Sequence, residues 1–288
     1  MSGRALPIGV FDSGVGGLTV LRALRLALPT EDFIYLGDTA RLPYGTKSPA
    51  TVIRYSLQCA AALVDRDIRC LVVACNTASA SALAALRLQY PSLPVIGVIE
   101  PGAAAAVAAS RTQHIAVIAT EGTIGGGAYQ DAIRRLNANA RVTPCACSLF
   151  VAMAEEGWTS GPIAAAVAQR YLDPIFGVAG APDTLVLGCT HFPVLAAAIR
   201  SVLPPTVQIV DSAATTAAAV LRQLQAAGPM VPETGAAPET GATPVTGAHC
   251  AAGRVTWLAT DGAARFARVG TTFLGETLHE ADIEIVDL

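Results

Sequence analysis

Charged residues are scarce in this 288-residue chain, and lysine is almost absent from it. Charged side chains make up 14% of the sequence, hydrophobic residues make up 52%, and Lys47 is the only lysine. An enzyme that depends on pyridoxal phosphate would have to form its Schiff base at that one residue, which argues against this cofactor. The net charge is −3 and basic residues are scattered, so the chain lacks the positive surface of a nucleic-acid binder. We therefore expect no cofactor and no direct nucleic-acid partner.

Long apolar segments are also missing. The richest tract, Ala103 to Ala109, is bounded by Pro101-Gly102 and by Ser110, and it is far shorter than the roughly 20 residues that cross a bilayer. The start of the chain does not show the basic and then apolar arrangement of a secretion signal. These absences predict a cytoplasmic protein without a membrane segment.

Seven cysteines, an odd number, occur in this chain. Without a secretion signal, they are expected to be free thiols rather than a disulfide framework, and most are expected to be inert core residues. Cys145 and Cys147 offer two neighbouring sulfurs, but no second Cys/His pair at zinc spacing accompanies them. The sequence thus predicts no metal site.

Short apolar runs rich in β-branched residues alternate with longer stretches of helical period. This alternation predicts an α/β fold in which a mostly parallel sheet is flanked by helices. The runs do not alternate polar with apolar residues, so their strands are expected to be buried on both faces, and polar residues at their carboxyl ends become the candidates for chemistry. The expected strands are Ile8–Phe11, Phe33–Leu36 and Cys70–Ala74, and the expected helices are Leu18–Leu28 and Val52–Val64.

The same pattern then occurs a second time along the chain. Ile8–Phe11 is matched by Ile115–Ile118, and Leu71–Ala74 is matched by Leu185–Gly188. In each half a cysteine directly follows the second of these runs: Cys75 after Ala74, and Cys189 after Gly188. We therefore expect two pseudo-symmetric lobes, each a mostly parallel sheet flanked by helices, with the active site in the cleft between them.

The expected first lobe comprises residues 1–98 and 210–288, and the second comprises residues 99–209. Residues 228–253 are rich in Pro, Gly, Thr and Ala and cannot bury a core, so they are expected to form a flexible insertion in which His249 and Cys250 have no role. The remaining expected elements are helix Leu195–Leu203, strand Val207–Val210, helix Ala213–Ala226, strand Val255–Ala259 and helix Ala263–Phe273.

The segments Cys75-Asn76-Thr77 and Cys189-Thr190-His191 have the composition of binding loops. Thiolate is the reactive form of cysteine, and loop N–H groups, a following helix N-terminus or a nearby histidine can stabilise it. Either cysteine alone would be interpreted as a buried structural residue. Because the two occupy matching positions in the repeat, a functional pair is favoured.

Two further loops carry polar groups. The Gly-rich turn that begins Asp12-Ser13 could hold a carboxylate on its backbone N–H groups, but it lacks the pattern of a nucleotide-binding loop. Asp12 could bind an ammonium group or tune a neighbouring thiol, and helix capping is the alternative. The loop Gly37–Ser48 could hold a distal carboxylate. Either Glu155 or Glu156 could orient His191, or the two could form a solvated helix end.

Four linked motifs lie along the chain: Asp12-Ser13-Gly14-Val15-Gly16-Gly17, Asp38-Thr39-Ala40-Arg41-Leu42-Pro43-Tyr44-Gly45, Ala74-Cys75-Asn76-Thr77-Ala78-Ser79 and Gly188-Cys189-Thr190-His191-Phe192-Pro193. Together they resemble the glutamate racemase family, and their order and spacing fit from Ile8 to Leu288. The departures are Gly126 in place of an expected serine, Ala152 and Ala154 in place of proline and valine, and the additional residues 228–253. They leave the catalytic assignment intact.

This resemblance implies a cofactor-independent racemase that interconverts L- and D-glutamate and supplies the D isomer for peptidoglycan synthesis. It implies that Cys75 acts on D-glutamate with Asp12 assisting, and that Cys189 acts on L-glutamate with His191 assisting and Glu155 orienting the imidazole. A homodimer is also implied. Some members of the family bind DNA gyrase, but nothing in this sequence identifies a surface for it. The implied substrate contacts are Asp12, Ser13, Tyr44, Gly45, Asn76, Thr77, Thr190 and His191.

Three alternatives stay open. An aspartate racemase would share the cysteine pair but would need a smaller cleft. The dipeptide Tyr44-Gly45, which ends the long motif that begins at Asp38, argues for glutamate as the substrate. A nucleophilic Cys189 working with His191 would give an amidase or a thioester enzyme, but it leaves Cys75 without a role. The third alternative is a binding protein.

Overall fold

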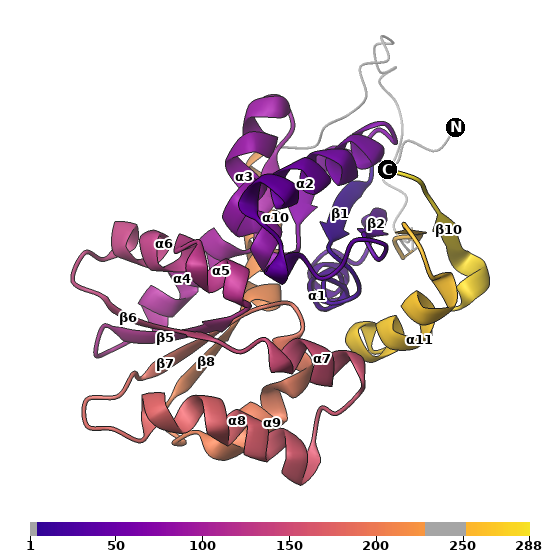
Figure 1. Ribbon diagram of the computed structural model, residues 1–288. Coiled ribbons are helices and arrows are strands. Elements are labelled where there is room, and N and C mark those ends of the chain that lie inside the picture. The colour runs from indigo at the N-terminus through magenta and orange to yellow at the C-terminus, as the bar shows by residue number, and fades with distance from the viewer. Residues whose placement is uncertain (1–4, 228–251) are drawn as a thin grey trace, which may run out of the picture.

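The strands form two separate sheets, one in each lobe (Figure 1). In this computed structural model, which describes residues 5–227 and 252–288, every strand pairing within these ranges is parallel. The predicted α/β fold of two lobes is confirmed. The first sheet contains β1 (Ile8–Asp12), β2 (Phe33–Gly37), β3 (Cys70–Val73), β4 (Val95–Gly97), β9 (Val255–Ala259) and β10 (Ile283–Ile285); the second contains β5 (His114–Ala119), β6 (Arg141–Ala146), β7 (Thr184–Gly188) and β8 (Gln208–Asp211).

The internal repeat predicted from the sequence is present in the topology. The first sheet includes the run β2-β1-β3-β4, and the second sheet has the same order, β6-β5-β7-β8. The register agrees as well, because Phe11 pairs with Val73 and the matching Ile118 pairs with Leu187. Cys75 and Cys189 therefore follow equivalent strands at equivalent positions. The expected return of the chain to the first lobe is made by β9, which pairs with β2.

Helices cover both faces of each sheet. In Figure 1 the second lobe, drawn from magenta to orange, has α4 and α6 on one side of its sheet and α8 and α9 on the other. On the first lobe, α2 packs beside α3, while α1 contacts both α10 and α11. The helices are α1 (Leu18–Ala27), α2 (Pro49–Val64), α3 (Asn76–Gln89), α4 (Ile99–Ala109), α5 (Glu121–Gly125), α6 (Ala128–Leu136), α7 (Leu149–Glu155), α8 (Gly161–Phe176), α9 (Ala196–Val202), α10 (Ser212–Ala227) and α11 (Ala263–Leu274).

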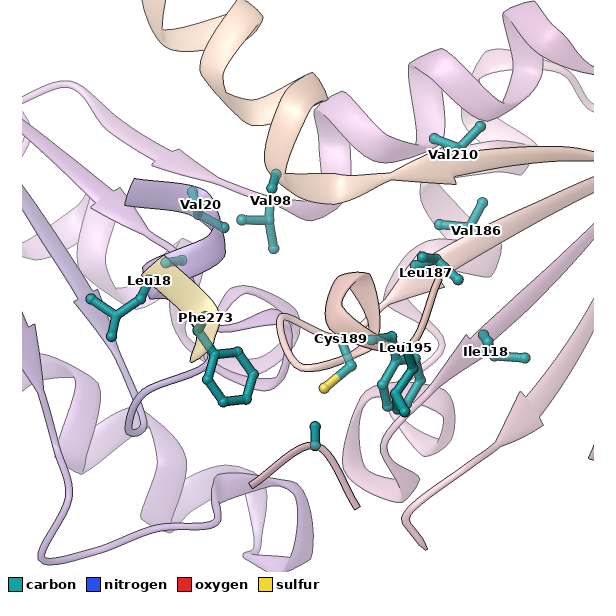
Figure 2. Packing of buried hydrophobic residues seen from close by; sticks show 14 of the residues in the cluster. Leu18, Val20, Val98, Ile118, Val186, Leu187, Cys189, Leu195, Val210 and Phe273 are labelled. Atoms are coloured by element: carbon teal, nitrogen blue, oxygen red, sulfur yellow. The ribbon is translucent and has the colours of Figure 1, made fainter. Parts of the chain in front are cut away.

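Burial on both faces explains the unbroken apolar runs of the strands. Successive side chains of a strand point to opposite faces, and in β1 the side chains of Ile8 and Val10 enter one core cluster while Phe11 enters the other. The first of these clusters continues into the second lobe, as Figure 2 shows with Leu18 on one side and Val186 on the other. Helix α10 packs against both α1 and α4, so the two lobes share one continuous core.

Local signals set the ends of several elements. Helix α2 begins before the predicted Val52, because the Ser48 side chain accepts a hydrogen bond from the Thr51 N–H and Pro49 occupies the first turn, where proline is well tolerated. Strand β6 was not predicted. It contains Pro144, which fits there because β6 lies at the edge of its sheet.

Within the described ranges, no helix is long and apolar enough to cross a membrane. The predicted insertion at 228–253, with His249 and Cys250, lies outside the described residues except for Ala252 and Gly253. The lobe boundaries drawn from the sequence stay a prediction.

Candidate active site

Cys75 lies at the junction of β3 and α3 and is buried, with 5% of its surface exposed. Its sulfur accepts a hydrogen bond from the Ala78 N–H at 3.4 Å, and its thiol donates to the Ser13 hydroxyl at 3.6 Å. Burial raises the pKa of Cys75 to about 12, the charge of Asp12 adds to this, and the contacts with Ala78 and Ser13 oppose it. At neutral pH Cys75 is therefore a thiol.

Cys189 occupies the equivalent position after β7, and its surroundings differ. Its sulfur lies 3.9 Å from Nδ1 of His191, and Nε2 of that ring lies 3.0 Å from Oε1 of Glu155. Arg265, on α11, donates to Oε2 of Glu155 at 2.8 Å. In Figure 2 the sulfur of Cys189 points away from Leu195 and toward the side on which Phe273 lies. A chain of four polar groups thus runs from the thiol to the protein surface.

The His191 ring is held in its charged form. Burial lowers its pKa, but the contacts with Cys189 and Glu155 outweigh burial and raise the pKa to about 10. Burial also acts on Glu155, yet the hydrogen bonds from His191 and Arg265 hold its pKa below the ordinary value. Cys189 therefore faces an imidazolium, whereas Cys75 faces the carboxyl group of Asp12.

The raised pKa of His191 predicts how stability depends on pH. Because the pKa is about 10 in the folded protein against 6.5 ordinarily, the contribution of His191 to the free energy of unfolding is fully present below about pH 6.5 and is lost as pH rises to about 10. Urea unfolding of the parent and of His191→Asn should show a difference in the free energy of unfolding at pH 6.5, and this difference should be smaller at pH 10. An equal difference at both pH values would contradict the charged imidazole.

The two lobes touch directly beside these groups. A Cβ atom at Gly16 would lie 2.4 Å from both Nδ1 of His191 and Oγ1 of Thr190, so only glycine fits there. The Thr19 hydroxyl donates to the Thr190 carbonyl at 3.0 Å. Cys189 is among the charges that raise the pKa of Cys75, so the two sulfurs lie within electrostatic reach. The turn after β1 and the loop after β7 are therefore parts of one site.

Among the residues that the structure describes, two buried oxygen atoms at this site have no hydrogen-bond partner: Oδ1 of Asp12 and Oδ1 of Asn76. The other oxygen of Asp12 accepts from the Gly14 N–H at 3.0 Å, and the Asn76 amide donates to the Tyr129 hydroxyl at 2.9 Å. Burial raises the pKa of Asp12. Unpaired buried acceptors are costly unless a donor completes them. An ammonium group would supply such donors.

Three threonine hydroxyls join the lobes on the other side of Cys75. Thr77 lies 3.0 Å from Thr120 and 3.1 Å from Thr123, and the latter two are 3.0 Å apart. A Cβ atom at Gly45 would lie 2.8 Å from Thr120. Sequence reasoning missed Thr120 and Thr123. The repeat offers a signal for Thr120, because Asp12 and Ala119 each end the first strand of their half, which makes Thr120 the counterpart of Ser13.

The side chain of Tyr44 is held inside the loop that follows β2. It is buried, and its hydroxyl donates to Asp38 and contacts the Cys59 sulfur. Asp38 also accepts from Arg41 at 2.8 Å and from the Thr260 hydroxyl at 3.0 Å. Asp38 thus anchors the loop that presents Gly45 to the second lobe.

This anchor predicts a binding defect. Asp38→Asn is expected to raise KM for the substrate about tenfold, equivalent to about 1.4 kcal/mol, and to change kcat less, because weaker charged hydrogen bonds let the loop move. Asp67→Asn is the matched control, since Asp67 is exposed and has a φ of 56°, which asparagine adopts readily. A KM unchanged in Asp38→Asn would remove this role for the loop.

The structure brings all the predicted site residues to the seam between the lobes, except that the Tyr44 hydroxyl is turned toward Asp38. Glu155, rather than Glu156, is the acid that contacts His191. Within residues 5–227 and 252–288, no group of three or more His, Cys, Asp or Glu side chains could hold a metal ion.

A fold of two repeated parallel sheets with one thiol at the matching end of each is shared by a known class of racemases. The model of the Asp/Glu/hydantoin racemase family matches residues 8–220. The chain belongs to this family, whose members are isomerases.

Its relatives within the family are glutamate racemases. The protein from Geobacter metallireducens is 51% identical over 94% of this chain and 93% of its own length, and the one from Koribacter versatilis is 44% identical over 100% and 99%. Among solved structures, the glutamate racemase of Francisella tularensis in complex with D-glutamate superposes with a TM-score of 0.83 at 35% identity, covering 100% of this chain and 98% of that one. The aspartate racemase of Picrophilus torridus, 16% identical with a TM-score of 0.52 over 76% of this chain and 94% of that chain, shares the fold alone.

Proposed function

We propose that this protein interconverts L- and D-glutamate by a 1,1-proton transfer between two thiols, without a cofactor. The observation that carries the proposal is the placement of Cys75 and Cys189 at equivalent strand ends, buried and within electrostatic reach of each other. A racemase must remove a proton from one face of the α-carbon and deliver one to the other face. Two acid/base groups in a pseudo-symmetric seam meet that need.

The two thiols begin in opposite protonation states. Cys189, as the thiolate paired with the His191 imidazolium, removes the α-proton of L-glutamate, and the Cys75 thiol delivers its own proton to the opposite face to give D-glutamate. In the reverse direction Cys75 is the base, and Asp12 takes part in that proton transfer. Glu155 keeps the imidazole oriented through its 3.0 Å contact with Nε2.

Substrate groups fit the polar atoms of the loops. The α-ammonium group pairs with the free oxygens of Asp12 and Asn76. Hydroxyls of Ser13, Thr77 and Thr190 supply donors for carboxylate oxygens, and the backbone at Tyr44 and Gly45 holds the distal carboxylate. Because these donors are fixed by burial and by contacts within the loops, they stabilise the negative charge that develops when the α-proton leaves.

The test is to incubate the purified protein with L-glutamate, a chelator and no pyridoxal phosphate, and to measure D-glutamate by enantioselective chromatography. The proposal expects D-glutamate to approach an equal mixture and L-aspartate to remain unchanged. Racemisation of aspartate in preference to glutamate would show that aspartate is the substrate. No turnover of either amino acid would overturn the proposal.

We further propose that the D-glutamate is consumed in peptidoglycan synthesis in the cytoplasm and that the protein acts as a homodimer. The first part is what the resemblance of the four sequence motifs to the glutamate racemase family implies. Sedimentation of the purified chain tests the second part, and a single species at the monomer mass would exclude the dimer.

A further inference from the structure

A second pair of thiols lies close together outside the site described above. The sulfur of Cys147 lies 3.8 Å from the sulfur of Cys145, at the end of β6. Strand β6 is at the edge of its sheet and pairs with β5 alone in the described residues. The two cysteines are separated by one alanine, and the proposed racemase chemistry uses neither of them.

The two thiols differ in access to solvent. Cys147 is fully buried, whereas Cys145 is half-buried and can meet a small reagent. The hydrogen bond from Cys147 lowers the pKa of Cys145, and the same contact raises the pKa of Cys147. An accessible thiolate beside a buried thiol is the arrangement of a reactive cysteine and its resolving partner.

We propose that Cys145 and Cys147 form a reversible disulfide in the presence of a hydroperoxide, and that this disulfide lowers racemase activity. The effect on activity rests on the proposed function. The Cys145 thiolate attacks the peroxide, the O–O bond breaks, and a sulfenic acid forms. The Cys147 sulfur then attacks the sulfenic sulfur, the S–S bond forms, and the S–O bond breaks with release of water. Two thiols lose two protons and two electrons in total, and hydrogen peroxide is reduced to two waters.

Disulfide formation moves backbone that supports the active site. A disulfide bond is about 2.05 Å long, so the sulfurs must approach each other from 3.8 Å. The Cys147 N–H donates to the Ala119 carbonyl at 2.8 Å, and the Cys147 carbonyl accepts from the Phe150 N–H at 3.1 Å.

These two hydrogen bonds connect Cys147 with two segments that contribute residues to the site. Ala119 directly precedes Thr120, and Phe150 is in the first turn of α7, which ends at Glu155. A displacement at Cys147 therefore reaches both the threonine cluster and the acid that holds His191. A disulfide across one intervening residue is strained, and strained disulfides are readily reduced by free thiols.

The experiment treats the full chain with a small excess of hydrogen peroxide, removes the peroxide with catalase, and divides the sample. One portion is assayed for activity before and after dithiothreitol, and in the other the remaining thiols are blocked by alkylation. Trypsin releases both cysteines in the single peptide Val142–Arg170, which contains no other cysteine. We expect this peptide to be lighter by two hydrogens and unalkylated, with activity reduced several-fold and restored by dithiothreitol.

Two variants separate this pair from the other thiols. Cys145→Ser should keep the basal activity and resist the reversible loss, while Cys250→Ser should respond like the parent. Equal loss in Cys145→Ser would assign the effect to other cysteines, and a disulfide without loss of activity would remove the regulatory role. The peptide mass tests the disulfide even if the untreated protein does not racemise glutamate, so a failure of the proposed function is distinguishable.

Discussion

Serine at either Cys75 or Cys189 lowers kcat/KM for glutamate racemisation by about 10²–10⁴-fold, which is the contribution expected of a positioned acid or base. A serine hydroxyl is a far weaker acid than a thiol, so it neither forms the base nor returns the proton. Since L- and D-glutamate have equal free energies in water, kcat/KM must fall by the same factor in both directions. Circular dichroism of the reaction started from each isomer measures both values.

Cys70→Ala is the control for these variants, because Cys70 is buried in β3 but is not part of the seam between the lobes. It should retain activity close to that of the parent. The double variant of Cys75 and Cys189 should lose little more than the worse single variant, since the two groups act as a unit. Near-full activity in either single serine variant would contradict the two-thiol mechanism.

Gly16→Ala is expected to reduce kcat/KM about 100-fold, while the protein still folds. The added Cβ would lie 2.4 Å from Nδ1 of His191 and from Oγ1 of Thr190, so the imidazole and the Thr190 side chain must shift from their positions beside Cys189. A misplacement of about 1 Å at a reacting group costs about 10²-fold in rate. Steady-state kinetics and a thermal unfolding curve of the variant together separate a loss of activity from a loss of stability.

Gly125→Ala is the matched control, because a Cβ at Gly125 meets no other atom within 4 Å. It lies in α5 and should leave both activity and stability close to those of the parent. If Gly16→Ala were as active as Gly125→Ala, the close approach of the first lobe to the Cys189 loop would have no catalytic importance.

The repeated half of the fold was predictable because its strands are buried on both faces. Val10 and Phe11 face different core clusters yet are both apolar, so the strand appears in the sequence as an unbroken run. Strands β3 and β7 are also buried along their whole length, which made the two cysteines visible at matching positions. The return of the last strand to the first lobe was also expected, whereas its position beside β2 was not.

Other parts depend on contacts that no local pattern encodes. Strand β6 is partly exposed and contains a proline, so its sequence does not stand out as a strand. Arg265 reaches Glu155 only because α11 folds back against the second lobe (Figure 1). The role of Asp38 was hidden for a similar reason, because its partner Thr260 is distant in sequence and is brought near by β9.

The repeat makes the two thiols equivalent in position, but their neighbours carry different charges. Burial and the charge of Asp12 raise the pKa of Cys75, whereas Cys189 faces an imidazolium held by Glu155. A two-base racemase needs one thiolate and one thiol at the start of each turnover. The sequence showed the matching positions, but the direction of the asymmetry required the contacts.

The most direct test of the two-thiol account is the isotopic content of the first product formed in deuterated water. L-glutamate with protium at the α-carbon is incubated with the protein, and both isomers are analysed by mass spectrometry at low conversion. We predict that the D-glutamate carries α-deuterium while the recovered L-glutamate is still largely protiated, because Cys189 keeps the proton that it removes and Cys75 delivers one from solvent. D-glutamate that retains a substantial share of the original α-protium would show that one group removes and returns the proton, and would contradict the account.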